Sequence, residues 1–314
     1  MNGSAGKIEI FKPFGEAFEL TKKILFQPFN FEKWLVIGFA AFISGHFAGI
    51  GFNFPFGGFP THDANQNFVS SDWEQWKPWL LVGIVVGGTL ILALIIVLTW
   101  LKARGNFIFT DCIVRNRPAI VDPWREYRRE GNSYFLFLLL LMFASVAVFG
   151  LLLVPVWLCL QFFSQDSGSH VLVMLIAIFG VLVVLAWICF AFFFGVTAYF
   201  VVPVMYVRRC REIEAFRQVA ALVLKNVATF ILFCLFGICL LLGAGMIGGI
   251  ATCATCCLAA LPYVGTVILL PIFVFLRAYG FRFIRQFGPD YDVWTILPQP
   301  EGLPIPPVPP PLSS

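Results

Sequence analysis

Residues 78–101 read PWLLVGIVVGGTLILALIIVLTWL and contain no charged side chain. A helix of about 20 mostly apolar residues crosses the roughly 30 Å hydrocarbon core of a bilayer. This stretch therefore predicts a membrane-spanning helix. Five further stretches have the same character, namely Trp34–Phe52, Tyr134–Leu160, Val171–Tyr206, Val227–Ile250 and Leu261–Ile284.

The composition of the whole chain agrees with this prediction. Hydrophobic residues make up 60% of the 314 residues and charged residues 12%, against about 45–50% and about 25% in globular proteins. A soluble protein of this size cannot hide so much apolar surface from water. We exclude a soluble enzyme, a disordered protein and a nucleic-acid-binding module. We expect an all-α fold, a polytopic transmembrane helical bundle with six spans arranged as three hairpins.

The basic residues indicate how the predicted spans are oriented. Twenty of the 21 Lys and Arg residues fall on one side of the predicted membrane, and Lys77 is the exception. Cytoplasmic loops contain the excess of Lys and Arg. We therefore expect both termini in the cytoplasm, with an amphipathic segment (1–33), a six-span domain (34–284) and a Pro-rich tail (285–314).

Each predicted hairpin follows an amphipathic, basic segment. In the first, six apolar or small residues share one helical face, opposite Glu16, Glu19, Lys22 and Lys23; they are Phe14, Ala17, Phe18, Thr21, Ile24 and Leu25. In the second, Asp122 is a candidate N-cap and Gly131 a candidate helix end. These cytoplasmic interfacial helices either anchor the spans or bind anionic lipid headgroups or a protein partner. The candidate binding residues are Lys22, Lys23, Arg125, Arg128, Arg129, Arg208, Arg209 and Arg211.

Small residues at fixed spacing suggest how the spans pack. Three small-xxx-small motifs permit close approach of helix backbones, and we expect a bundle that is tight on the outer side and splayed toward the cytoplasm. We also expect Arg277 and Arg282 to extend to the interface. Four prolines, Pro155, Pro203, Pro262 and Pro271, can kink the helices that contain them, while neighbouring helices bond the freed carbonyls. The motif residues are Gly45 and Gly49, Gly83 and Gly87, and Gly245 and Gly249.

Residues for catalysis are scarce in this sequence. The predicted spans contain no Asp or Glu, and His46 is the one histidine in the first five. No nucleotide-binding, nucleophile or metalloprotease motif is present, so we expect no enzyme, cofactor or metal. Cys253, Cys256 and Cys257 leave three alternatives open: apolar packing, a periplasmic disulfide or a metal site.

The C-terminal tail contains LPIPPVPPPL at 303–312. Such a segment is extended polyproline II, and it acts either as a docking peptide for an aromatic-lined groove or as a solvated tail.

Several short motifs resemble a known group of proteins. The chain is similar to bacterial polytopic membrane proteins that resemble the membrane domain attached to some glycerophosphodiester phosphodiesterases. This resemblance implies a bacterial inner-membrane protein and transfers no activity, because the soluble phosphodiesterase barrel has no counterpart here. The motifs are Phe11-Lys-Pro-Phe14, Thr21-Lys-Lys23, Pro28-Phe29, Lys33-Trp34-Leu35, Arg104-Gly105 with Asp111, Asp122-Pro-Trp124 and Leu261-Pro-Tyr-Val-Gly265.

Together these observations predict a non-enzymatic integral membrane protein. We expect a scaffold or accessory that organises lipid or a partner at the cytoplasmic face. The alternative is a carrier or channel for a lipid or a weakly polar solute, because a splayed bundle leaves a path for one.

Overall fold

The computed structural model describes residues 9–45, 73–163, 170–255 and 261–297, and this part of the chain is built from helices without strands. The α-helices are α1 (Phe11–Leu25), α2 (Phe31–Ile43), α3 (Trp73–Val114), α4 (Val121–Glu126), α5 (Arg128–Phe163), α6 (His170–Arg208), α7 (Glu212–Lys225), α8 (Val227–Ala254), α9 (Pro262–Ile268) and α10 (Leu270–Arg285). Two short 3-10 helices, η3 (Pro289–Tyr291) and η4 (Val293–Ile296), follow α10.

Four described helices are long and apolar enough to cross a membrane. Their candidate spans are Leu81–Val114, Arg128–Val154, Ile178–Arg208 and Val227–Ala254. These agree with four of the six predicted spans and identify a membrane protein by length and composition. The other two predicted spans differ: α2 has 13 residues before the undescribed residues begin at 46, and the last span is divided into α9 and α10.

The break between α9 and α10 has a simple cause. Pro271 has no backbone N–H, so the carbonyl of Val267 one turn earlier lacks the donor four residues on that it would have in a continuous helix. The indole Nε1 of Trp34 donates to that carbonyl at 2.8 Å. The predicted interruption is confirmed at Pro271, with its repair by a neighbouring helix. The bond from Trp34 also attaches α2 to α9, where the Tyr263 hydroxyl donates to the carbonyl of Leu35 at 3.2 Å.

The predicted interruption is absent at Pro155 and Pro203, because α5 and α6 continue through these residues. Pro262 occupies the first turn of α9, where no intrahelical bond is lost.

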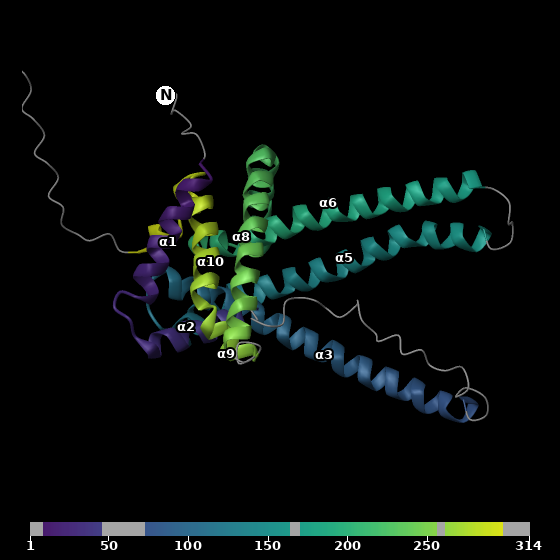
Figure 1. Cartoon of the computed structure of the whole chain (residues 1–314), viewed down its shortest axis with the longest axis horizontal. Helices are drawn as coiled ribbons and strands as arrows, with labels where there is room; N and C mark the ends of the chain where they lie inside the picture. Colours follow the sequence, from purple (N-terminus) through teal and green to yellow (C-terminus); the bar gives the residue numbers. More distant parts are fainter. Residues whose placement is uncertain (1–8, 46–72, 164–169, 256–260, 298–314) are drawn as a thin grey trace, which may run out of the picture.

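The core lies at one end of the long helices. It is formed by the C-terminal turns of α3 and α6, the first turns of α5 and α8, and α1, α7 and α10 packed around them. Beyond the core, α3, α5 and α6 extend outward while α8 runs across their direction (Figure 1). Beyond the core, these four helices expose apolar side chains, for example Leu90, Leu140 and Leu242.

The predicted bundle shape is therefore wrong. The tight contacts lie at the basic end of the helices, which by the predicted orientation is the cytoplasmic end. In the outer halves α3 diverges from α5 and α6, while α5 and α6 stay side by side, with Phe149 and Trp187 in contact (Figure 1). Ideal Cβ atoms at Gly83, Gly87, Gly245 and Gly249 would meet nothing within 4 Å, so the outer motifs do not bring described helices together. Gly45 has a positive φ of 92° beside Lys102, and Gly49 lies outside the described residues. The physical reason is that the outer halves are apolar on all sides and need no protein partner in lipid.

Other glycines permit the close helix contacts in the core. A Cβ on Gly38 would lie 2.9 Å from Val267, and one on Gly280 would lie 2.5 Å from the hydroxyl of Tyr199. At Gly105, where α2 crosses α3, an added Cβ would meet the backbone of Ile43 and Ser44.

Candidate functional site

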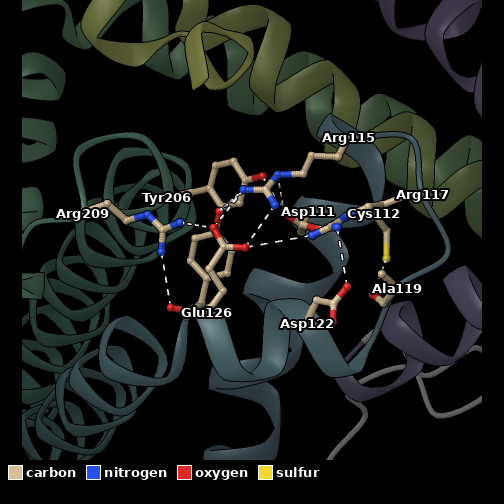
Figure 2. A network of polar contacts seen from close by, with 10 residues as sticks. Asp111, Cys112, Arg115, Arg117, Ala119, Asp122, Glu126, Tyr206 and Arg209 are labelled. Atoms are coloured by element: carbon tan, nitrogen blue, oxygen red, sulfur yellow. Dashed lines mark hydrogen bonds and ion pairs between the residues drawn. The ribbon is translucent and has the colours of Figure 1, made fainter. Parts of the chain in front are cut away.

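The most polar buried site surrounds Asp111 near the end of α3 (Figure 2). The Asp111 side chain is fully buried. The Tyr206 hydroxyl donates to it at 2.9 Å, and the Nε atoms of Arg115 and Arg117 lie 3.2 Å and 3.1 Å from its two oxygens. A buried carboxylate is tolerated when it is paired and hydrogen-bonded in this way. Asp111 therefore joins the end of α3 to the end of α6.

A second carboxylate, Glu126 at the end of α4, extends this network. Arg115 donates to both Glu126 oxygens, at 3.0 Å and 2.8 Å, and Arg209 donates to one of them. Burial alone would raise the pKa of Glu126, but the hydrogen bonds from these two arginines outweigh it and hold the pKa below its ordinary value. The same bond raises the pKa of Arg115.

Aromatic rings form one side of the network. The rings of Tyr127 and Tyr206 stack with their centroids 4.8 Å apart, and the guanidinium of Arg209 lies 3.9 Å from the centre of the Tyr127 ring. Arg209 has a positive φ of 52°, because the chain turns there between α6 and α7. The end of α3, the start of α5, the end of α6 and the short helix α4 thus meet at one junction.

The loop before α4 explains why these charges converge. Asn116 adopts a positive φ of 52° and turns the chain after α3, so that Arg117 returns toward Asp111. Asp122 lies in the first turn of α4 and makes no capping bond; its carboxylate is 3.7 Å from Arg117. The predicted N-cap at Asp122 is therefore wrong, because Ile120 occupies that position.

Gly131 likewise does not end the second amphipathic helix. It lies inside α5, where a Cβ would come 3.0 Å from the side chain of Arg104. The Arg104 guanidinium lies 4.6 Å and 4.9 Å from the ring centres of Trp100 and Trp124, and it donates to Asn132 at 2.8 Å. The absence of a side chain at 131 makes room for this arginine.

Arg277 also departs from the prediction. It does not extend to an interface: its side chain is buried between Tyr199 and Phe281, and it donates to the Thr110 hydroxyl at 3.4 Å. Arg282 is partly exposed, 4.0 Å from the ring centre of Trp294.

The eight predicted binding residues fall into two groups. Arg208 forms an ion pair with Asp290 at 2.8 Å, and Arg209 pairs with Glu126 in the network around Asp111. The remaining six are exposed and form no ion pair with another described residue: Lys22, Lys23, Arg125, Arg128, Arg129 and Arg211.

The prediction missed the network itself. The predicted second span ended at Leu101, whereas α3 continues to Val114 and buries Asp111 near its end. One signal was available, since residues 111–130 alternate acidic and basic side chains directly after a span. Tyr206, 95 residues away, gave no such signal.

The arrangement suits a structural joint better than a reaction. Its carboxylates are occupied by arginines, and among the described residues no three His, Cys, Asp or Glu side chains lie close enough together to hold a metal ion. Cys253 has a free thiol, while Cys256, Cys257 and His46 lie outside the described residues.

Comparison with known proteins completes the description. No curated protein matches the chain, and no solved structure matches it. The model of a family of unknown function, DUF7544, matches residues 9–285, which include every helix from α1 to α10. The chain belongs to the family of unknown function DUF7544.

Proposed function

We propose that this protein is a non-enzymatic membrane scaffold whose basic end binds anionic lipid headgroups at the cytoplasmic face of the inner membrane. The observation that supports it most directly is the set of six exposed basic residues without a described ion-pair partner. Near an anionic membrane surface each such residue contributes about 1 kcal/mol of attraction.

The position of these residues supports the proposal. Arg125 lies in α4, and Arg128 and Arg129 begin α5, whose apolar part is a candidate span. Cations at the end of a spanning helix lie at headgroup depth. The neighbouring carboxylate of Glu126 is already bonded to two arginines, so it does not neutralise them.

Native mass spectrometry of the purified protein tests this proposal. The triple change of Arg125, Arg128 and Arg129 to Gln should reduce retention of phosphatidylglycerol, by up to about fivefold per residue, and should leave phosphatidylcholine unchanged. As matched single variants, Arg128→Gln should weaken phosphatidylglycerol retention more than Arg208→Gln, because Asp290 already neutralises Arg208. Equal retention in the wild type and the triple variant would refute the proposal.

The orientation requires a separate test. Both termini and the segment near Arg125 should support fluorescence of a fused cytoplasmic reporter and should leave a fused periplasmic phosphatase inactive. Phosphatase activity from a fusion near Arg125 would show that the orientation is the opposite of the proposed one.

Three further hypotheses concern the tail, an alternative function and a family relationship. The tail from residue 298 lies outside the described residues; a partner that it recruits should be lost from purified complexes when residues 298–314 are deleted. The alternative function, a carrier or channel for a lipid or weakly polar solute, predicts flux in proteoliposomes. The relationship to the membrane domains attached to glycerophosphodiester phosphodiesterases also stays a proposal, which rests on the short motifs alone.

A further inference from the structure

An open groove of about 700 Å³ lies between α1 and the last turns of α10. Its α1 wall includes Glu16, Glu19 and Lys23, and its α10 wall includes Arg282 and Arg285. The groove therefore presents charges of both signs within one concave surface. Lys23 also belongs to the basic set proposed above to bind anionic lipids, whereas Glu19, Arg282 and Arg285 do not.

The charges in the groove are only partly satisfied within the protein. Arg282 Nη1 is 3.4 Å from a Glu16 oxygen, and its buried Nε has no hydrogen-bond partner among the described residues, so only the guanidinium end can meet a ligand. Arg285 uses its Nε to bind Asp292 at 2.9 Å. Glu19 and Lys23 are exposed and form no ion pair with another described residue. Both a cationic and an anionic group thus remain available to a ligand.

The frame of the groove is held in place by packing. The guanidinium of Arg282 lies over the ring of Trp294 in η4 at 4.0 Å, which orients it along the groove wall. The other face of α1 buries Ala17, Thr21 and Ile24, and α1 packs on α10. At Gly15, on the groove's rim, an added Cβ would meet nothing within 4 Å, so the groove is open there.

We propose that this groove binds a phosphate–ammonium zwitterion, a phosphoethanolamine group. The phosphate oxygens accept hydrogen bonds from Arg282, Arg285 and Lys23, and the primary ammonium donates to Glu19. A simple anion would satisfy the cations and face Glu19 unfavourably, whereas a simple cation would do the reverse. The group could belong to a soluble molecule or to the headgroup of phosphatidylethanolamine.

The full-length protein in detergent micelles tests this inference by ³¹P NMR titration with soluble phosphoethanolamine and, separately, inorganic phosphate. Glu19→Gln should weaken phosphoethanolamine binding about threefold, the effect of losing one exposed ion pair. The same change should leave inorganic phosphate binding equal or tighter, because it removes a repulsive charge. A loss of folding would weaken both ligands alike and cannot mimic this pattern.

Matched variants separate the groove from general charge effects. Lys23→Gln should weaken binding of both ligands, while Lys12→Gln, on the same helix but outside the groove, should weaken neither. Glu214→Gln, an exposed carboxylate on α7, serves as the control for Glu19→Gln.

Competition between soluble phosphoethanolamine and phosphatidylethanolamine shows which of the two supplies the bound phosphoethanolamine group. Phosphatidylethanolamine added to the micelles displaces soluble phosphoethanolamine if the lipid headgroup is the ligand; failure to displace it assigns the groove to the soluble molecule. Failure of both compounds to bind, or a Glu19→Gln variant that binds phosphoethanolamine as well as the Glu214→Gln control, overturns the inference. These outcomes are independent of phosphatidylglycerol retention, which tests the proposed function.

Discussion

Replacing Gly105 with Ala should destabilise the crossing of α2 and α3. A Cβ at this position would lie 2.6 Å from Ile43 Cγ2, 2.7 Å from the Ile43 carbonyl carbon and 2.7 Å from the Ser44 nitrogen. Two of these atoms belong to the backbone, so no side-chain rotation can relieve the overlap. Ordinary contact begins at 3.4 Å, and the end of α2 would therefore have to move by about 0.7–0.8 Å.

The size of the effect follows from two opposing contributions. Overpacking of this kind costs about 1–3 kcal/mol, and the better helix propensity of Ala returns up to about 1 kcal/mol. We expect a net loss of about 1–2 kcal/mol, which lowers the thermal midpoint by a few degrees in a chain of this size. Gly105→Val should lower it further.

Tryptophan fluorescence of the protein in detergent, followed during heating, measures this change. Gly87→Ala is the matched control, because its Cβ would lie in open space on the same helix. It should leave the midpoint unchanged or slightly higher. An equal midpoint for Gly105→Ala and Gly87→Ala would refute the reasoning, because it would mean that the α2–α3 contact does not exist in the folded protein.

Three other changes test the contacts of the core. Asp111→Asn should lower the same thermal midpoint strongly, since breaking a buried ion pair costs about 3–5 kcal/mol, whereas the exposed Asp122→Asn should not. The pKa of Glu126 is lowered in the folded protein, so its stabilising contribution is complete above its ordinary pKa of 4.5 and is lost as the pH falls through its lower pKa in the folded state. The difference in thermal midpoint between the wild type and Glu126→Gln should therefore shrink in acid. A difference that stays constant with pH would contradict this. Trp34→Phe should cost about 1–2 kcal/mol, because the carbonyl of Val267 loses the hydrogen bond from the indole, and an unchanged midpoint would argue against that bond.

Some local features were predictable because they depend on neighbours in sequence. Four of the six residues predicted on one face of α1 are buried, Ala17, Thr21, Ile24 and Leu25, since a period of 3.6 residues brings them together in any helix. Phe14 and Phe18 are exposed, so the prediction is wrong at those two positions. That Pro271 removes a backbone donor was predictable from the sequence, but the same argument applied to Pro203, through which α6 continues. The hydrogen bond from Trp34 to the carbonyl of Val267 was not predictable, because the two residues meet only when α2 packs on α9.

The candidate site was predicted much less well. The eight basic residues were chosen by charge alone, and charge does not show which cations already have a carboxylate partner. Arg209 has Glu126, 83 residues earlier, and Arg208 has Asp290. Such long-range partners cannot be inferred from spacing, and they leave six of the eight available for binding.

Local pattern was enough to establish that this chain is helical and belongs in a membrane. In hydrocarbon every backbone group must be bonded within its own segment, so a long apolar stretch has one solution, whatever surrounds it. The position of the core at the basic end of the helices, the burial of Asp111 and Arg277, and the groove between α1 and α10 arose only from tertiary packing. Each depends on side chains far apart in the chain, whose meeting is decided by how the helices cross.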